Sequence, residues 1–379
     1  MKKSSFYVGL LFCFVSSSLF GQGQISPNPN PEGNTIKLTT GSWSNSQIFQ
    51  NDGTIDGNLS GAVFTNDNTL NNGSKGTIGF AAAWTNPIFA TINNSGIFAP
   101  NGGGSFTNSG HFNNEQGGTF ESDAPVDNKA PGLINNSGTF QLYWGGTLNN
   151  ASGSYFNNLS GGTVNIETQS IVTNDGSLTN SGQINVQQSS ALFNTTSGTL
   201  TNNGTIDTTH GTLTNNGTLN GSGRIIGSYT DHGLTKPGNS AGVMTIDGDY
   251  FKVDGSKEIE LGGLFDGGGD KTLTEFDWVD VTGNVELAGT LDVSLIDGFN
   301  LHRGNEFNFL RVDGTLSGQY DDLGEGDLVG NFGGQDLFIT YGGGDGNDVG
   351  LFTNAVPEPT TLLIWSMLAG VGMSVRRRR

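Results

Sequence analysis

A short phrase that recurs from about residue 33 to residue 223 limits what this chain can fold into. The phrase is an apolar residue, a spacer, Asn or Asn-Asn, a small residue, Gly, Thr and another apolar residue. It reads IFQNDGTI at 48–55, LINNSGTF at 133–140 and IVTNDGSL at 171–178. The adjacent units GTLTNNGTIDTTH and GTLTNNGTLNGSG at 198–223 share their first eight residues. A unit this short cannot bury its own apolar face, so stacked neighbours must bury it, as in a solenoid.

Each half of the phrase alternates apolar and polar residues, which is typical of a strand with one buried face. The N-[NDS]-G between the halves predicts a turn with positive-φ positions. Such turns can join antiparallel hairpins into a meander or sandwich, or they can mark the corners of a parallel β-helix with asparagines stacked in ladders. Many units at irregular spacings near 13 to 20 residues favour the β-helix. A coil of about 20 residues and a rise of about 4.8 Å predict a body roughly 75 Å long.

The composition supports an all-β fold. The chain has 379 residues, of which 62 are Gly and 24 are Phe, and only 33% are hydrophobic and 13% charged. Such a composition is poor in helix formers and fits many short strands joined by tight turns. Disorder is the alternative for a chain so rich in Gly and polar residues, but the regular recurrence of apolar residues argues against it. We therefore expect almost no helix between the two ends of the chain.

The second half of the body, 224–354, is richer in Asp and has longer strand candidates at 257–261, 278–281, 289–295, 306–312 and 336–341. Its runs SGRIIGSYTDHGLTKPGNSAGVMTIDGDY at 222–250 and VDVTGNVELAGTLDVSLIDGF at 279–299 resemble the passenger β-helix repeats of autotransporter-like surface proteins. Unlike a true autotransporter, the chain is not expected to have a C-terminal membrane barrel. Export must then use another route.

The first 23 residues have the layout of a secretory signal peptide. Lys2 and Lys3 give a basic start, 6–15 is apolar, and 16–23 is rich in small residues. The apolar stretch is too short to span a membrane. It contains the single cysteine, Cys13, which large apolar residues precede, so a lipoprotein signal is disfavoured. The exported chain is expected to have no thiol and no disulfide.

The end of the chain has three parts in a fixed order. Pro357, Glu358 and Pro359 are followed by an apolar run at 362–375, and the chain ends with the four cations Arg376, Arg377, Arg378 and Arg379. As a helix the run would reach about 21 Å, short of the ~30 Å hydrocarbon core. We therefore predict a temporary stop in the inner membrane with the arginines on the cytoplasmic side. A permanent tail anchor is the alternative.

These three parts, over residues 356–379, resemble the PEP-CTERM sorting signal, which exosortase systems recognise. The resemblance implies export toward the cell surface or the exopolysaccharide matrix, an exosortase-type membrane peptidase as partner, and cleavage near the Pro-Glu-Pro motif. It also implies that the contact with the inner membrane is transient.

The net charge of the chain indicates which partners it can bind. The whole chain has a formal charge of −19, and its two ends contain six cations and one anion, so their removal leaves −24. A surface this acidic repels phosphate backbones, so we expect no nucleic-acid partner. Extracellular polysaccharide is a candidate partner, since aromatic residues such as Trp43, Trp84, Tyr143 and Trp144 could stack on sugars if exposed.

The sequence contains only weak matches to catalytic and metal-binding motifs. Residues 238–242 match G-x-S-x-G around Ser240, but a strand rather than a helix is expected after them, which argues against a nucleophile elbow. GGGDGNDVGL at 342–351 resembles one calcium-binding nonapeptide, yet it occurs once, so Asp345 and Asp348 are interpreted as a solvated turn. The loop at 266–270, with an aspartate at each end, is interpreted in the same way. The four histidines, at 111, 210, 232 and 302, follow no metal-ligand spacing.

The sequence thus predicts four segments: a signal peptide at 1–23, an Asn/Gly-rich β-solenoid at 24–223, a β-rich passenger-like region at 224–354 and the sorting signal at 355–379. The expected function is a non-catalytic structural or adhesive protein of the cell surface or biofilm matrix, with no catalytic residues, metal site or cofactor. The alternative is a secreted polysaccharide-active β-helix enzyme. A lyase would need a cationic base and a glycosidase two nearby carboxyls; between residues 40 and 223 the cations are only Lys75 and Lys129.

Overall fold

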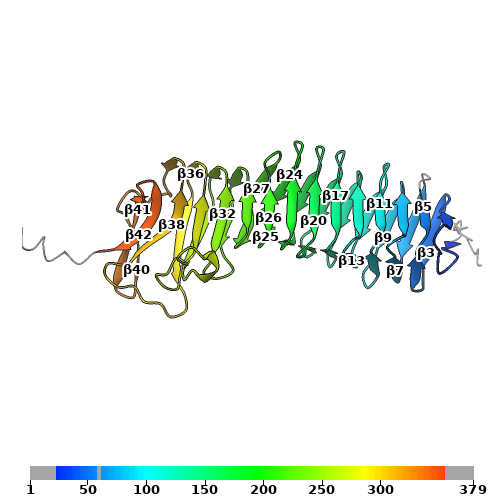
Figure 1. Cartoon of the computed structure of the whole chain (residues 1–379), viewed down its shortest axis with the longest axis horizontal. Coiled ribbons are helices and arrows are strands. Elements are labelled where there is room, and N and C mark those ends of the chain that lie inside the picture. Colours follow the sequence, from blue (N-terminus) through cyan, green and yellow to red (C-terminus); the bar gives the residue numbers. More distant parts are fainter. Residues whose placement is uncertain (1–22, 58–60, 355–379) are drawn as a thin grey trace, which may run out of the picture.

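The protein is an elongated, three-sided parallel β-solenoid, seen in the computed structural model (Figure 1). The structure describes residues 23–57 and 61–354. Through the repeats, each coil gives one strand to each of three sheets, which we name A, B and C, and neighbouring coils pair in parallel. The all-β solenoid expected from the repeats is confirmed, and the antiparallel meander is excluded for them. The one helix among the described residues is the short 3-10 helix η1 (Lys271–Leu273).

The strands of the three sheets follow one another along the solenoid axis. Sheet A has 14 strands: β1 (Gly23–Gln24), β3 (Gly41–Asn45), β6 (Ala62–Asn66), β9 (Ala83–Asn86), β12 (Ser105–Asn108), β15 (Pro125–Asn128), β18 (Thr147–Asn150), β21 (Ile171–Asn174), β24 (Ala191–Asn194), β27 (Thr212–Asn215), β30 (Tyr229–Asp231), β33 (Tyr250–Lys252), β36 (Val285–Leu287) and β39 (Leu316–Gly318). Sheet B has 12 strands: β4 (Phe49–Asn51), β7 (Thr69–Asn72), β10 (Thr91–Asn94), β13 (His111–Asn114), β16 (Leu133–Asn136), β19 (Tyr155–Asn158), β22 (Ser177–Asn180), β25 (Thr199–Asn202), β28 (Thr218–Gly221), β31 (Leu234–Pro237), β34 (Ser256–Leu261) and β37 (Thr290–Leu295). Sheet C has 16 strands: β2 (Thr35–Lys37), β5 (Thr54–Gly57), β8 (Thr77–Phe80), β11 (Ile97–Pro100), β14 (Thr119–Ser122), β17 (Thr139–Leu142), β20 (Thr163–Ile166), β23 (Gln183–Val186), β26 (Thr205–Asp207), β29 (Arg224–Ile226), β32 (Val243–Asp247), β35 (Trp278–Val281), β38 (Glu306–Val312), β42 (Asp348–Thr353), β41 (Gln335–Gly343) and β40 (Leu328–Phe332).

Most strands of the repeats are four residues long, and their second and fourth side chains point into the solenoid. In β16, Ile134 and Asn136 are buried while Leu133 and Asn135 face outward. The inward apolar positions of successive coils stack into one continuous core. In the N-terminal half this core is rich in aromatic rings, such as Phe120 and Phe140, whose centroids lie 4.2 Å apart. Stacking of coils therefore buries the apolar face that no single unit could bury.

The inward asparagines at the strand ends form two ladders along the axis. Within each ladder the Nδ2 of one Asn donates to the Oδ1 of the next Asn at 2.7 or 2.8 Å, and successive members are mostly 20 to 24 residues apart. Both ladders confirm the predicted stacking of asparagines. The first ladder lies at the corner from sheet B to sheet C and contains Asn30, Asn51, Asn72, Asn94, Asn114, Asn136, Asn158, Asn180 and Asn202. The second lies at the corner from sheet A to sheet B and contains Asn66, Asn86, Asn108, Asn128, Asn150, Asn174, Asn194, Asn215 and finally Asp231.

The glycine of the N-[NDS]-G phrase serves a different purpose from the one predicted. Gly138 has no positive φ; instead, a Cβ at this position would lie 2.2 Å from the carbonyl oxygen of Gly118 in the preceding coil. The prediction of a positive-φ turn was therefore wrong here, because close approach of neighbouring coils is what requires glycine. Positive φ occurs at other turn positions, for example at Gly117 in a corner from sheet B to sheet C and at Trp144 and Gly145 in a corner from sheet C to sheet A.

The C-terminal part continues the three sheets across residue 224 and then changes its pairing. The strands expected at 278–281 and 306–312 are observed with these bounds as β35 and β38. Beyond β38, sheet C ends in the antiparallel strands β42, β41 and β40, which close this end of the solenoid (Figure 1). No helix among the described residues is long and apolar enough to cross a membrane.

Candidate functional site

A buried ion pair interrupts the apolar interior where the second ladder ends. Asp231 ends β30 at the position that Asn215 occupies in the preceding coil, and Lys252 ends β33 at the same position in the following coil. The Nζ of Lys252 lies 2.8 Å from Oδ2 of Asp231, and neither side chain has any exposed surface. It is the only ion pair among the described residues in which both side chains are fully buried, so both charges depend on partners within the protein.

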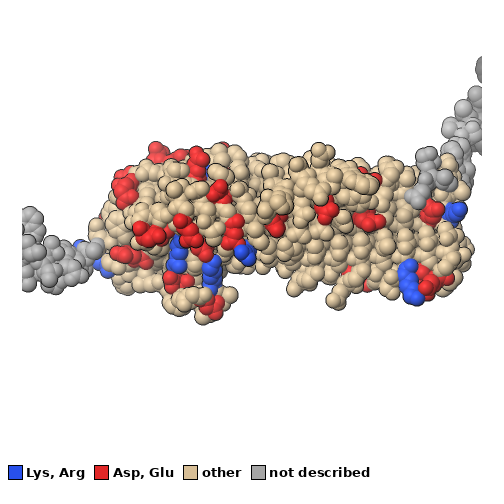
Figure 2. All heavy atoms as spheres, turned by 45° about the horizontal axis from the view of Figure 1, so that its top comes forward, with Lys and Arg blue, Asp and Glu red and all other residues tan. Residues whose placement is uncertain are grey.

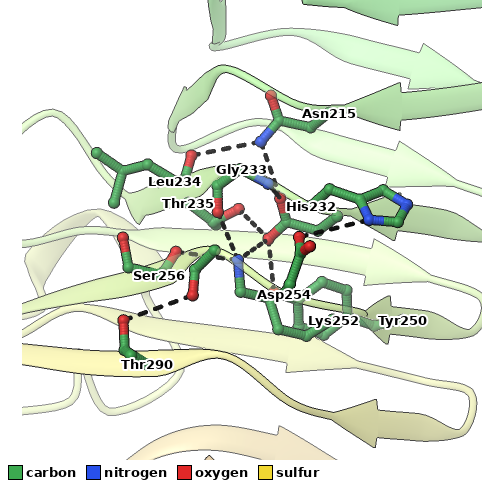
Figure 3. Close-up of polar contacts among 12 residues, drawn as sticks. Asn215, His232, Gly233, Leu234, Thr235, Tyr250, Lys252, Asp254, Ser256 and Thr290 are labelled. Carbon is green, nitrogen blue, oxygen red and sulfur yellow. Dashed lines mark hydrogen bonds and ion pairs between the residues drawn. The ribbon is translucent and has the colours of Figure 1, made fainter. Parts of the chain in front are cut away.

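The Asp231 carboxylate accepts five hydrogen bonds. Its Oδ1 accepts from the Asn215 amide at 2.8 Å and from the Gly233 backbone N–H at 3.1 Å. Its Oδ2 accepts from the hydroxyls of Thr235 and Tyr250, at 2.7 and 3.1 Å, and from Lys252 (Figure 3). These donors come from three successive coils, so the carboxylate joins strands β27, β30, β31 and β33.

The Lys252 ammonium is also fully engaged. Besides Asp231 it donates to the carbonyl oxygens of Gly233 at 2.6 Å and Ser256 at 3.0 Å. Burial lowers the pKa of Lys252, whereas the neighbouring Asp231 acts to raise it. A second buried lysine, Lys257, has no hydrogen-bond partner; its Nζ lies 4.7 Å from the centre of the Tyr250 ring. Burial lowers the pKa of Lys257 to about 7. The cluster is thus closed to soluble substrates but is chemically unusual for an apolar interior.

A surface groove of about 410 Å³ lies over sheet B near this cluster. Its lining residues come nearest to the set of acids and bases that a polysaccharide-active enzyme would need. Its cation, Lys236, pairs with Glu258 at 2.5 Å. Asp277 accepts backbone N–H bonds from Gly242 at 2.9 Å and Glu260 at 3.0 Å. Burial raises the pKa of Asp277 to about 8, and the two N–H groups act in the opposite direction. Of the three acids that line the groove, Glu258 thus pairs with Lys236 and Asp277 is hydrogen-bonded to the backbone.

A second groove, of about 640 Å³, lies between the loop at 262–277 and the C-terminal strands. Asp266 pairs with Arg311 at 2.8 Å, and this arginine stacks 3.9 Å from the centre of the Trp278 ring. Glu325 accepts from the Thr340 hydroxyl at 2.7 Å and from the following backbone N–H at 2.7 Å. The Asp266 pair thus ties the loop at 262–277 to β38, and Glu325 ties the segment before β40 to β41.

Among residues 23–57 and 61–354, no group of three or more His, Cys, Asp and Glu side chains is placed to hold a metal ion. Ser240 is exposed in the turn between β31 and β32, and the following element is a strand, as expected. Asp345 is exposed, but Asp348 is buried and accepts from the backbone N–H of Val312 at 2.9 Å, so the interpretation of both as a solvated turn was wrong for Asp348. Burial raises the pKa of this carboxyl. Asp270 accepts from the backbone N–H of residue 272 and caps η1.

The aromatic residues named as candidate sugar platforms divide into two groups. Trp84 is buried and stacks on Phe64, with ring centroids 4.0 Å apart, so it belongs to the core. Trp144 has 73% of its surface exposed and contacts Tyr143 edge-on, 5.2 Å between centroids. Trp43 is partly buried. The Tyr143 and Trp144 pair is therefore the one exposed aromatic surface that the prediction found.

No protein-family profile matches this sequence, and no curated protein matches it significantly. The predicted sorting residues, Pro357, Glu358 and Pro359 with the cations at 376–379, lie outside the described residues, as does the predicted signal peptide up to residue 22.

Sequence reasoning missed the buried Asp231 and Lys252. A signal was present: TNNG at 214–217 is replaced by TDHG at 230–233, so an aspartate stands where the repeat has its ladder asparagine. An acid at an inward position predicts a buried cation nearby, but the register between coils was needed to identify Lys252 as that cation.

Proposed function

We propose that this chain is an exported, non-catalytic structural or adhesive protein of the cell surface or exopolysaccharide matrix. Its transport is proposed to depend on the N-terminal signal peptide and on an exosortase-type peptidase that acts near Pro357, Glu358 and Pro359. The proposal rests on the fold together with the terminal sequence patterns. A long solenoid with a continuous core is a suitable rigid spacer or scaffold, because each coil stabilises its neighbours.

The surface supports this proposal. Figure 2 shows a largely uncharged middle of the solenoid on one face, with acidic side chains gathered over the C-terminal coils. On sheet B an outer row of asparagines runs along the axis; in it, Asn93 donates to Asn71 at 2.9 Å and Asn113 to Asn93 at 2.8 Å. Such a row of amides at regular spacing leaves donors and acceptors for a polar polymer lying along the axis. Extracellular polysaccharide is therefore the proposed ligand class.

The alternative, a polysaccharide lyase or glycosidase, gains less support from the geometry. The groove over sheet B is the nearest match, but its lysine and two of its three acids are paired or hydrogen-bonded within the protein. A glycan-binding array with the secreted protein, together with a screen for polysaccharide depolymerisation, separates the two functions. We expect binding without cleavage. Turnover of any polymer, lost on Glu260→Gln, would overturn the non-catalytic proposal.

The sorting step is tested by two alterations in the native host. Deletion of residues 356–379 should release a soluble protein that has not been processed at its C-terminus. Replacement of Pro357 and Pro359 by Ala and of Glu358 by Gln should leave the full-length chain in the membrane, because the apolar run and the arginines still halt export. Thr360→Ala with Thr361→Ala, next to the motif, is the matched control and should be processed normally. A released wild-type protein that still ends in Arg379, seen by mass spectrometry, would replace this mechanism with a simple anchor.

A further inference from the structure

We propose that Lys252 and Asp231 join spontaneously in an intramolecular amide bond, an isopeptide crosslink between two adjacent coils. This inference goes beyond the proposed function and does not depend on it. It starts from the position of the two reacting groups. The amine and the carboxylate are 2.8 Å apart, both are fully buried, and the strand register of β30 and β33 keeps them opposite each other. Such fixed proximity replaces an encounter in solution and removes much of the entropic barrier.

The carboxyl group is placed to act as the electrophile. Its Oδ1 is held by the Asn215 amide and the Gly233 backbone N–H, which are two donors aimed at one oxygen. In a tetrahedral intermediate this oxygen carries the negative charge, so the two donors form an oxyanion hole. The other oxygen, Oδ2, faces Lys252 and the hydroxyls of Thr235 and Tyr250, which can deliver protons to the departing oxygen.

The amine becomes the nucleophile by proton transfer within the pair. Burial disfavours charge on Lys252, and a charged pair in a dry interior can relax by passing a proton from the ammonium to the carboxylate. The neutral Nζ then attacks Cγ of Asp231 and a C–N bond forms. Of the three ammonium protons, one stays on the amide nitrogen and two leave with Oδ2 as water. The step is a net dehydration and requires no oxidant or other reactant.

The surroundings keep the product from reverting. Tyr229 and Tyr250 stack with ring centroids 5.4 Å apart beside the pair, and both rings are fully buried, as is Tyr320. Because neither side chain has exposed surface, bulk water seldom reaches the amide, and its hydrolysis is slow once the product water has left. After reaction, Oδ1 is the amide carbonyl oxygen and keeps its hydrogen bonds to Asn215 and Gly233. The crosslink ties β30 to β33 where the second asparagine ladder ends.

The experiment is a tryptic digest of the full, unfolded chain followed by tandem mass spectrometry. Trypsin cuts after Arg224, Lys252 and Lys257 but not between Lys236 and Pro237. An uncrosslinked protein therefore yields the peptide 225–252 at full mass. The proposed bond blocks cleavage at Lys252 and yields 225–257 lighter by one water. When this peptide is then cleaved with a protease that cuts before Asp247, the fragment with Asp231 and the fragment with Lys252 should remain joined through the new amide.

Controls separate the crosslink from other dehydrations. A succinimide at Asp247 or Asp254, each of which precedes Gly, would also remove one water, but it would leave Lys252 cleavable and Asp231 unjoined to Lys252. Lys252→Met should abolish the mass loss, whereas Lys257→Met, at the other buried lysine, should retain it. Asp231→Asn should form the same amide with loss of one ammonia. Recovery of 225–252 with Lys252 cleaved from wild-type protein, either at full mass or with dehydration confined to Asp247 or Asp254, would overturn the proposal without any variant being needed.

Discussion

At the scale of single residues, the amide of asparagine fits the inner corners because its polar atoms match what two neighbouring coils offer. Asn136 accepts at Oδ1 from Asn114, and its Nδ2 donates to Asn158 at 2.8 Å and to the carbonyl oxygen of Thr163 at 3.1 Å. An aspartate accepts but cannot donate. The ladder can therefore end on Asp231 but could not pass through it, and the next coil must supply a cation. The sequence predicted the stacking of asparagines because their spacing is visible, whereas the Asp231 and Lys252 pair required the register between coils.

The two rows of asparagines on β16 allow a matched test of this reasoning. Asn136→Ala removes a buried group with three hydrogen bonds and leaves donors and acceptors without partners, so we expect a loss of about 2–4 kcal/mol in the free energy of unfolding. Asn135→Ala, one residue away in the outer row and partly exposed, should cost less than about 1 kcal/mol. Urea unfolding followed by fluorescence measures both. Equal losses of unfolding free energy in the two variants would mean that burial of the ladder amide adds nothing to stability.

At the scale of the elements, one phrase serves two different corners. The eight identical residues at 198–205 span β25 and β26 and turn from sheet B to sheet C, whereas those at 211–218 span β27 and β28 and turn from sheet A to sheet B. The 13-residue unit is therefore part of a coil, and a coil length could not be read from it. The third corner, from sheet C to sheet A, has no ladder asparagine but has positive-φ residues such as Trp144 and Gly145. Because each corner glycine looks alike in sequence, the crowding around it could not be predicted without the neighbouring coil.

Two glycines from different corners test whether crowding or backbone conformation is the stronger constraint. Gly138→Ala places a Cβ 2.2 Å from the Gly118 carbonyl oxygen, which must move with its coil, so we expect a loss of about 3 kcal/mol in unfolding free energy. Gly145→Ala has open space but a φ of +82°, which costs about 1–2 kcal/mol. Thermal and urea unfolding of the two variants provide the comparison. A larger loss at Gly145 would show that backbone strain, not close approach, limits these corners.

At the scale of the whole molecule, the solenoid has one continuous core and must protect the ends of its sheets. The sequence predicted the elongated all-β body because the repeat is dense enough to require stacking. It did not predict how the C-terminal end closes, since the antiparallel strands there follow no repeat. Leu337, Ile339, Val349 and Leu351 in β41 and β42 are buried at this end. These strands pair along β38 and shield apolar side chains of the last parallel coils, such as Phe307.

Truncation after residue 318 should therefore cause the chain to aggregate. It removes β40, β41 and β42, frees the edge of β38 and uncovers Phe307, so an open parallel edge and an apolar surface become available to other chains. Truncation after residue 354 retains all three strands and is the matched control. Both proteins begin at residue 24 and are compared by size-exclusion chromatography with light scattering. We expect a monomer for the longer chain and oligomers or precipitate for the shorter one. A monodisperse shorter chain whose circular dichroism retains the same β signal per residue would show that the parallel coils are stable without the antiparallel strands.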